Sequence, residues 1–389
     1  MRWLRVLLLL RRDLYALYLA LLPTLTIWHL GQSIHWKSGH RKICKLYNTY
    51  TSSSSFQALE QHTKMDGLLL SHLTALLSCI DPAEWHVSTP IFRFRSLLQG
   101  PPASNDSSTP PICPKHSLTA DFIDDLYSRF ENNNFSIHSH FKSYAHGIFP
   151  DASRLFNHSC MPNAAVKYRI HSHESVQMQV VALRSIAQGE EICIPYLDPA
   201  LVQTRPTIFE LTYGFTCTCP SCRVVRDVGT LPEPPQDPAE FQNICRRLGE
   251  FVKTMGESPF LTGNSALFPK DLACVLHESF ITSLSDIFSQ ASHDGPHAIA
   301  VEASETLLAL YQLIYPPNYP QIGLHLVERA KASWNYLVSS DSLSTARVDD
   351  LKRGLSSAVK ILSVIEPEGD QEDGPMKDIQ MLLNDVRTV

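Results

Sequence analysis

The chain has 389 residues, of which 44% are hydrophobic and 19% are charged, and its formal net charge is −6. This length favours two or three domains, and the composition is typical of a globular protein and excludes a largely disordered one. The acidic balance argues against direct nucleic-acid binding, which needs a basic surface. It favours a basic peptide as the partner.

The first thirty residues are unusually apolar. A short run over Leu7–Leu10 is followed by a longer one between Leu14 and Trp28. At about 15 residues, the longer run is below the roughly 20 that span a bilayer, and it also resembles the core of a signal peptide. Two interpretations stay open, a signal or anchor and a start region that does not belong to the functional protein. We expect the second, and therefore no membrane association.

Residues 56–130 have a helical pattern, because apolar residues recur three and four positions apart, as over 65–77 and 121–130. From 135 to 196 the apolar runs become short and rich in residues that favour β-structure, as over 176–181. This change predicts strands and turns in the second region.

A Pro-rich stretch over 231–238 predicts a linker, and the chain after it becomes helical again. Apolar residues fall on one face of three expected helices, within 322–337, 348–362 and 376–386. Antiparallel helices joined by short connections would bury these faces. Two alternatives remain for this part, a helical domain that only packs and a concave surface that binds protein.

Three of the ten cysteines crowd into a C-x-C-x-x-C motif made of Cys217, Cys219 and Cys222. In a long chain, crowded cysteines favour metal binding in a reducing compartment over a disulfide framework. Structural zinc takes four ligands, usually thiolates, in a tetrahedron. We expect Cys160 to be the fourth ligand, because it lies in an unusual polar segment that needs anchoring.

Three motifs together resemble the SET domain family. Residues 157–163 (NHSCMPN) look like its NHSCxPN signature, residues 189–196 (GEEICIPY) like its GEE…Y strand, and residues 217–222 like its post-SET segment. The resemblance implies an α+β, β-rich SET fold with a knot-like loop and a zinc-bound post-SET segment. It also implies a protein-lysine N-methyltransferase that uses S-adenosyl-L-methionine and carries Zn²⁺.

Residues 34–44 (IHWKSGHRKIC) are similar to the end of a MYND zinc finger, whose last two ligands would be His40 and Cys44. A SET domain interrupted by this finger and followed by an all-α, TPR-like domain is the arrangement of the SET and MYND domain-containing (SMYD) group. The chain departs from it, because residues 1–30 contain no cysteine and no Gly-x-Gly strand. We therefore expect a remnant of the finger, as in a truncated or misassembled start.

The resemblance assigns roles to particular residues. Tyr196 and Tyr213 match the catalytic tyrosines of the lysine channel. Residues that match the family's donor-binding positions are Asn133, Asn157, His158, Tyr196 and Phe215.

Two H-x-H pairs occur between residues 138 and 173. They are formed by His138 and His140 and by His171 and His173. With no acidic or cysteine partner at a useful spacing, we interpret these histidines as surface loop residues.

The family arrangement implies the following order: an atypical apolar segment over 1–30, a MYND remnant over 31–48, a helical insertion over 49–130, the SET core over 131–199, the post-SET zinc segment over 200–226 and a TPR-like domain over 239–389. The leading hypothesis for function is methylation of an exposed lysine on a histone or non-histone protein, by a monomer in the cytoplasm or nucleus. The alternative is a catalytically inactive scaffold that binds protein and has lost its donor site.

Overall fold

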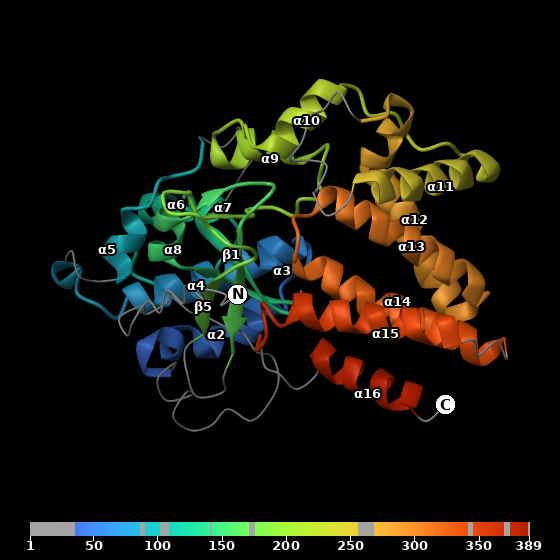
Figure 1. Cartoon of the computed structure of the whole chain (residues 1–389). Coiled ribbons are helices and arrows are strands. Elements are labelled where there is room, and N and C mark those ends of the chain that lie inside the picture. The colour runs from blue at the N-terminus through green and yellow to red at the C-terminus, as the bar shows by residue number, and fades with distance from the viewer. Residues whose placement is uncertain are drawn as a thin grey trace.

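The computed structural model describes residues 36–85, 90–101, 109–140, 142–170, 176–255, 268–340, 345–368 and 374–387. The apolar start predicted over 1–30 lies outside these ranges. Within them, no helix combines the length and the apolar character that a membrane crossing requires. Figure 1 shows the strands and the first helices on one side of the molecule, and a stack of long helices on the other.

The first part is a layer of helices that surrounds the long helix α4 (Gln61–Leu77). One face of α4 carries Leu70, Leu73 and Leu77, which are buried against Leu126 and Phe130. The helices expected between 56 and 130 are therefore confirmed. The other elements of this part are η1 (Trp36–His40), α2 (Arg41–Thr51), α3 (Ser54–Gln57), η2 (Pro82–Glu84), α5 (Pro90–Arg95), α6 (Ala120–Tyr127) and α7 (Phe130–Asn133).

Among the described residues, six strands follow in three two-stranded sheets, and the strands expected for 135–196 are therefore present. The first sheet pairs β1 (Asn134–Ser139) with β2 (Lys142–Ile148), and the second pairs β4 (Ala164–Arg169) with β5 (Gln177–Ala182), both antiparallel. The third pairs the short strands β3 and β6 in parallel and is described with the site. One helix within this region was not predicted, α8 (Pro150–Leu155), which begins with Pro150 at a position where a missing N–H is harmless.

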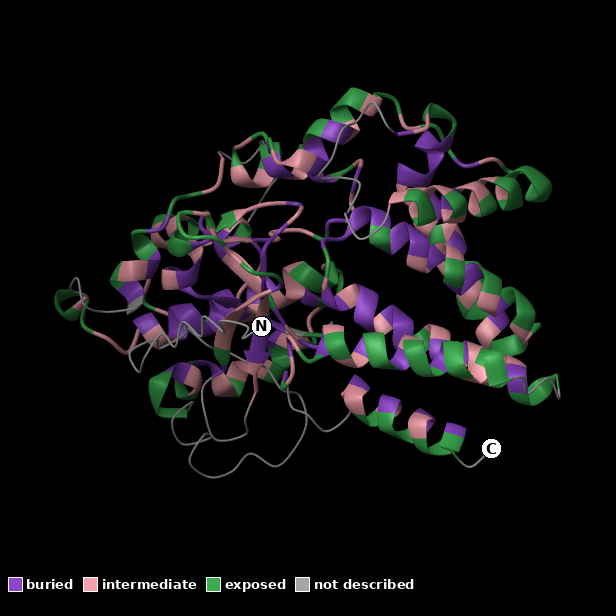
Figure 2. Cartoon of the chain, in the orientation of Figure 1, coloured by how far each residue is buried: buried purple, intermediate pink, exposed green. Residues whose placement is uncertain are grey.

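The carboxyl-terminal part consists of helices that pack on their chain neighbours. The expected apolar faces are buried there, because Leu326, Leu355 and Ile379 are all buried. Figure 2 shows buried and exposed residues alternating along these helices. The largely helical character predicted for this part is confirmed. Its elements are α11 (Pro238–Met255), η6 (Lys270–Leu276), α12 (Glu278–Asp294), α13 (His297–Ile314), α14 (Pro320–Ser339), α15 (Thr345–Leu362) and α16 (Pro375–Arg387).

The two parts share one hydrophobic core. Ala165 and Leu183, from the strand region, are buried in the same cluster as the helices α13 to α16. The amide of Asn318 donates to the carbonyl of Leu183 at 2.9 Å, and the hydroxyl of Tyr315 donates to Asp198 at 2.9 Å. The helical part therefore holds a fixed position beside the strands.

His138 and His140 are less exposed than the surface loop residues expected from the sequence, although His140 does lie in the turn after β1. His138 lies in β1, and its Nδ1 is 3.0 Å from the carboxylate of Glu368. His140 Nε2 lies 3.2 Å from Glu366, and its backbone N–H donates to Glu368. The acidic partners come from a segment more than 220 residues away in sequence, so local spacing gave no sign of them. The pair His171 and His173 lies outside the described residues.

Replacing Glu368 with alanine is expected to lower the free energy of unfolding by about 1–3 kcal/mol, because the partly buried N–H of His140 and the ring of His138 would lose their acceptor. Only 1% of Glu368 is exposed, so water does not replace the lost contact. Urea denaturation followed by circular dichroism measures the change. Glu366→Ala is the control, since this carboxylate is more exposed and its loss should cost less. Equal costs for the two variants would contradict this account.

Candidate functional site

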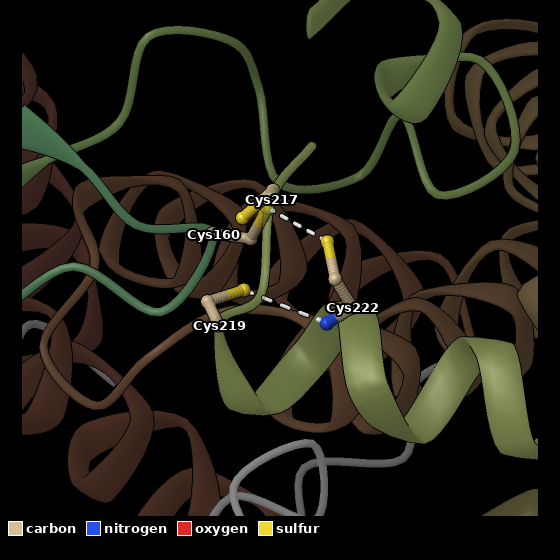
Figure 3. A group of neighbouring side chains, drawn as sticks. All are labelled: Cys160, Cys217, Cys219 and Cys222. Atoms are coloured by element: carbon tan, nitrogen blue, oxygen red, sulfur yellow. Dashed lines mark hydrogen bonds between the residues drawn. The ribbon is translucent and has the colours of Figure 1, made fainter. Parts of the chain in front are cut away.

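Four cysteines come together beside the parallel pair β3 (Asn157–His158) and β6 (Cys193–Ile194). Cys160 follows β3, whereas Cys217, Cys219 and Cys222 surround the start of α10 (Pro220–Val228), as Figure 3 shows. Their four sulfur atoms all lie within 4.8 Å of one another. Tetrahedral zinc with Zn–S bonds of about 2.3 Å places its thiolates about 3.8 Å apart, which is inside this limit, so the cluster can close around a structural zinc ion.

The local backbone favours thiolates in this cluster. Cys219 is the N-cap of α10, where its sulfur accepts the backbone N–H of Cys222 at 3.5 Å. The positive end of the helix dipole stabilises negative charge at this position. Hydrogen bonds within the cluster lower the pKa of Cys217 and Cys219 and raise the pKa of Cys160 and Cys222, so the local contacts favour two of the four thiolates. Deprotonated cysteines are what a metal ion requires.

A cavity of about 790 Å³ opens next to the cluster. It is lined by all the residues that the sequence assigned to donor binding and by the second tyrosine, namely Asn133, Asn157, His158, Tyr196, Tyr213 and Phe215. These residues come from segments between 133 and 215, so the fold gathers them from several elements. The sequence analysis missed a further part of the lining, for which no motif gave a signal: Ser96, Leu97, Leu98, Ser153 and Arg154.

A second cavity, of about 270 Å³, adjoins the first, and five residues line both: Asn132, Asn133, Ser153, Tyr196 and Tyr213. One side of it comes from the strand region, with Phe135 and Tyr168. The opposite side belongs to the carboxyl-terminal part and contains Tyr319, Pro320, Gln321, Ile365 and Glu368. The sequence predicted none of these carboxyl-terminal residues as part of a site.

Tyr196 lies at the centre of this arrangement. Its hydroxyl donates to the carbonyl of Phe156 at 2.7 Å, and its ring centroid is 5.1 Å from that of Tyr213. Tyr213 ends the π-helix η3 (Phe209–Tyr213), which follows the short helix α9 (Arg205–Ile208). Burial raises the pKa of Tyr196, and that of Tyr213 to about 12. Both phenols are therefore neutral near pH 7 and able to donate a hydrogen bond.

His158 connects the cysteine cluster to Tyr196. Its Nδ1 accepts the backbone N–H of Tyr196 at 3.0 Å, and its Nε2 lies 3.2 Å from the sulfur of Cys160. Because Nδ1 is an acceptor, the neutral ring carries its proton on Nε2 and donates it to Cys160. The imidazole thus fixes the backbone at Tyr196, while the ring still lines the larger cavity.

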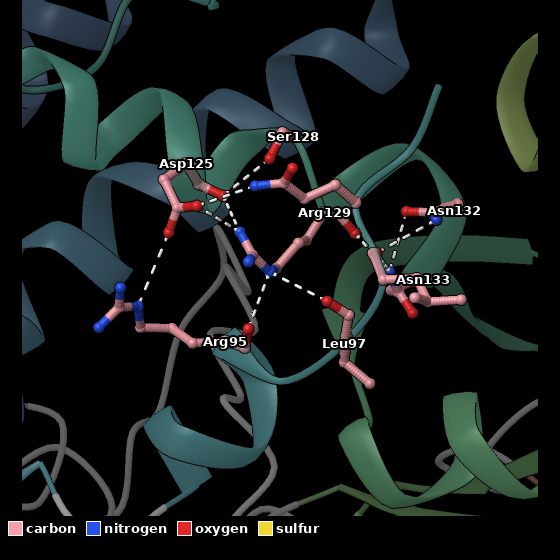
Figure 4. A network of polar contacts seen from close by, with 9 residues as sticks. Arg95, Leu97, Asp125, Ser128, Arg129, Asn132 and Asn133 are labelled. Carbon is pink, nitrogen blue, oxygen red and sulfur yellow. Dashed lines mark hydrogen bonds and ion pairs between the residues drawn. The ribbon is translucent and has the colours of Figure 1, made fainter. Parts of the chain in front are cut away.

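Asn133 shapes the wall of the larger cavity through its amide, which donates to the carbonyls of Leu98 at 2.9 Å and Arg129 at 3.0 Å. The guanidinium of Arg129 in turn donates to the carbonyls of Arg95 and Leu97 (Figure 4). This network holds the segment around Leu97 against the cavity. Only 8% of Asn133 is exposed, so its side chain mainly serves the wall.

Asn163 joins the two motifs that meet in the parallel pair. Its amide donates to the carbonyl of Glu191 at 2.8 Å, and its oxygen accepts the backbone N–H of Cys193 at 2.9 Å. Asn157, in contrast, is exposed and donates to the carboxylate of Glu191 at 2.6 Å. Asn163 was part of a recognised motif but had received no role, and its buried amide gives it one.

The two weaker metal candidates lie elsewhere. His40 ends η1 and Cys44 lies one turn later, in α2. The Nδ1 of His40 is 3.4 Å from His72 Nε2, and burial lowers the pKa of His40. In the part of the chain that the structure describes, no His, Cys, Asp or Glu pair joins these two to form a metal-sized group. Their role as zinc ligands stays a prediction.

Comparison with known proteins matches residues 40–197 to the SET domain family. Histone-lysine N-methyltransferase Smyd1 of Mus musculus is 23% identical over 211 residues, which cover 49% of this chain and 43% of that protein. Protein-lysine N-trimethyltransferase SMYD5 of Gallus gallus is 31% identical over 134 residues (33% and 30%). Histone-lysine N-methyltransferase ASHR1 of Arabidopsis thaliana is 23% identical over 310 residues (68% and 61%). The chain thus spans less than two thirds of each relative.

Proposed function

Because this chain carries a SET domain and is related to SMYD-type lysine methyltransferases, we propose that it is an S-adenosylmethionine-dependent protein-lysine N-methyltransferase. The observation that carries the proposal is the meeting of two cavities at Tyr196 and Tyr213. Methyl transfer to an amine is an in-line displacement, so donor and acceptor must approach the same point from different sides.

The larger cavity suits the donor. Its volume of about 790 Å³ is within the range of cofactor pockets, and its lining combines an aromatic ring, Phe215, with the polar groups of Asn157 and His158. S-adenosylmethionine, when bound there, supplies a methyl group on a cationic sulfonium. The residues of the chain orient it and exclude water.

The smaller cavity suits the lysine side chain. A lysine amine has a pKa near 10.4 and must be neutral to accept a methyl group. The rings of Phe135, Tyr168 and Tyr213 offer the amine apolar surface, which disfavours its charged form, whereas the carboxylates of Asp198 and Glu368 in the same lining favour that form. The hydroxyl of Tyr196, at the junction, holds the reacting groups in line through its hydrogen bonds. The chain's chemistry is therefore positioning and electrostatics.

The four cysteines serve as the structural zinc site of the post-SET segment. Four thiolates complete the tetrahedron and leave no open position for substrate, which is typical of structural zinc. The knot-like loop of the family would then be formed by residues 157–163 and fixed by Cys160. His158 contacts the sulfur of Cys160 and accepts the backbone N–H of Tyr196, so it links the position of Tyr196 to that of Cys160.

The substrate in this proposal is a protein with an exposed lysine, histone or non-histone, in the cytoplasm or nucleus, and the enzyme acts as a monomer with a TPR-like carboxyl-terminal part. The alternative of an inactive scaffold is less well supported. Every residue assigned to donor binding lines one cavity, as a working donor site requires.

Calorimetric titration of S-adenosylmethionine into the full chain tests the donor site. We expect saturable binding of one donor per chain, and Phe215→Ala should weaken it about tenfold, because the ring would no longer stack on the ligand. Phe92→Ala is the matched control, since this exposed ring of α5 does not line the cavity. A wild-type protein that gives no saturable heat would favour the scaffold instead.

A further inference from the structure

Arg205 begins α9 and is almost completely enclosed, with 1% of its surface exposed. Its guanidinium donates to the carbonyl of Pro199 at 2.5 Å and to the hydroxyl of Ser221 at 2.7 Å. Both acceptors are neutral, and Nε is buried with no hydrogen-bond partner. Among the described residues, no carboxylate forms an ion pair with Arg205. Burying an unpaired guanidinium is costly, so a compensating negative charge must lie nearby.

The four-cysteine cluster offers that charge. Ser221 lies in the first turn of α10, between Cys219 and Cys222, so the hydrogen bond from Arg205 reaches the turn that carries two of the sulfurs. Four thiolates around one divalent ion leave two excess negative charges, and Cys160, Cys217 and Cys222 are themselves buried. A centre of this kind is destabilised unless positive charge is enclosed with it.

Other groups near the sulfurs compensate only in part. The first turn of α10 and the Nε2–H of His158 are neutral donors. Arg226 reaches the carbonyl of Cys217 at 3.4 Å but is exposed, so water screens its charge. Of the two arginines that contact this segment, Arg226 is exposed, whereas Arg205 is shielded from water.

We propose that Arg205 is the buried counter-charge of the four-cysteine metal centre, and that it sets how tightly the centre holds its divalent ion. This role requires the metal centre but not methyl transfer. Arg205 does not touch the ion; it is a positioning and charge-compensating residue held by Ser221 and Pro199.

Zinc affinity of the purified full chain, measured by competition with a chromophoric chelator, tests the proposal. Arg205→Gln removes the charge but keeps donors for the two oxygens, and it should weaken zinc binding at least tenfold, the range seen when groups around metal ligands are removed. Arg205→Lys keeps the charge and should remain within about threefold of wild type. Arg223→Gln is the matched control on the exposed side of α10 and should leave the affinity unchanged.

Thermal unfolding with and without zinc distinguishes this role from simple packing. If Arg205→Gln lowers the midpoint of the zinc-free and zinc-loaded protein equally and leaves zinc affinity unchanged, the proposal is overturned. If that variant folds only with zinc, the zinc concentration that restores half of the folded protein replaces the affinity, and equal values for Gln and Lys would overturn the proposal. If the wild-type chain binds no zinc, the proposal is overturned because there is no metal centre for Arg205 to compensate. This outcome is independent of the titration with S-adenosylmethionine, which tests the proposed function.

Discussion

Tyr196→Phe is expected to slow lysine methylation at least about 100-fold while changing donor affinity less than about threefold. The substitution removes one hydroxyl, which lies where the two cavities meet and donates to Phe156. Loss of a single positioned donor at a reacting centre has costs of about this size. The ring stays, so the packing against Tyr213 and the wall of the donor cavity remain. Transfer of labelled methyl groups to mixed core histones, under single turnover, measures the rate.

Tyr315→Phe provides the control for that experiment. Its hydroxyl is also buried and hydrogen-bonded, to Asp198, but the residue lines neither cavity. We expect a small loss of stability and a nearly normal rate. Normal transfer by Tyr196→Phe would refute the proposed catalytic role. If wild-type protein binds the donor but does not methylate histones, histones are not its substrate. The same assay is then repeated with non-histone proteins as methyl acceptors.

Cys160→Ser is expected to abolish the binding of the single zinc ion and to lower the thermal midpoint by at least about 10 °C. A structural zinc site contributes its binding free energy to folding, with apparent values of about 10–16 kcal/mol in small zinc domains. Cys160 and the other three cysteines come from segments more than 50 residues apart, so the ion would tie distant parts of the chain together. Zinc content by atomic absorption and the midpoint by calorimetry are the two measurements.

Cys193→Ser is the comparison for the zinc experiment. This cysteine lies in β6, which pairs with β3 just before Cys160, yet its sulfur is not part of the cluster. It should keep one zinc per chain and a midpoint close to wild type. Retention of a full zinc equivalent by Cys160→Ser would show that the fourth ligand lies elsewhere. Cys222→Ser then shows whether the triad binds the ion at all.

The sequence predicted the site residues that belong to short contiguous motifs. NHSCMPN and C-x-C-x-x-C each keep their members within a few positions, so the cysteine group and the aromatic and polar lining of the larger cavity could be anticipated. The amphipathic stripes of the carboxyl-terminal helices were equally readable, because their period follows from helix geometry alone.

What could not be predicted depends on contacts between distant segments. Glu368 has no local feature that links it to His138, and Tyr319 does not show by its neighbours that it lines a cavity. Nothing in the sequence around Arg205 indicates that its side chain is buried, whereas the fold leaves only 1% of it exposed. In each case the sequence supplies the residue, while tertiary packing alone supplies its partner.

The smaller cavity has one wall from the strand region and the other from the carboxyl-terminal helices. The groups that would transfer the methyl and the groups that would choose the peptide are thus encoded in separate stretches of the gene. Gln321 and Ile365 lie far in sequence from Tyr196 and from the four clustered cysteines. Paralogues built on this plan can diverge in the proteins they modify while they inherit one unchanged reaction, and exchanging the carboxyl-terminal helices between them would exchange their preferences.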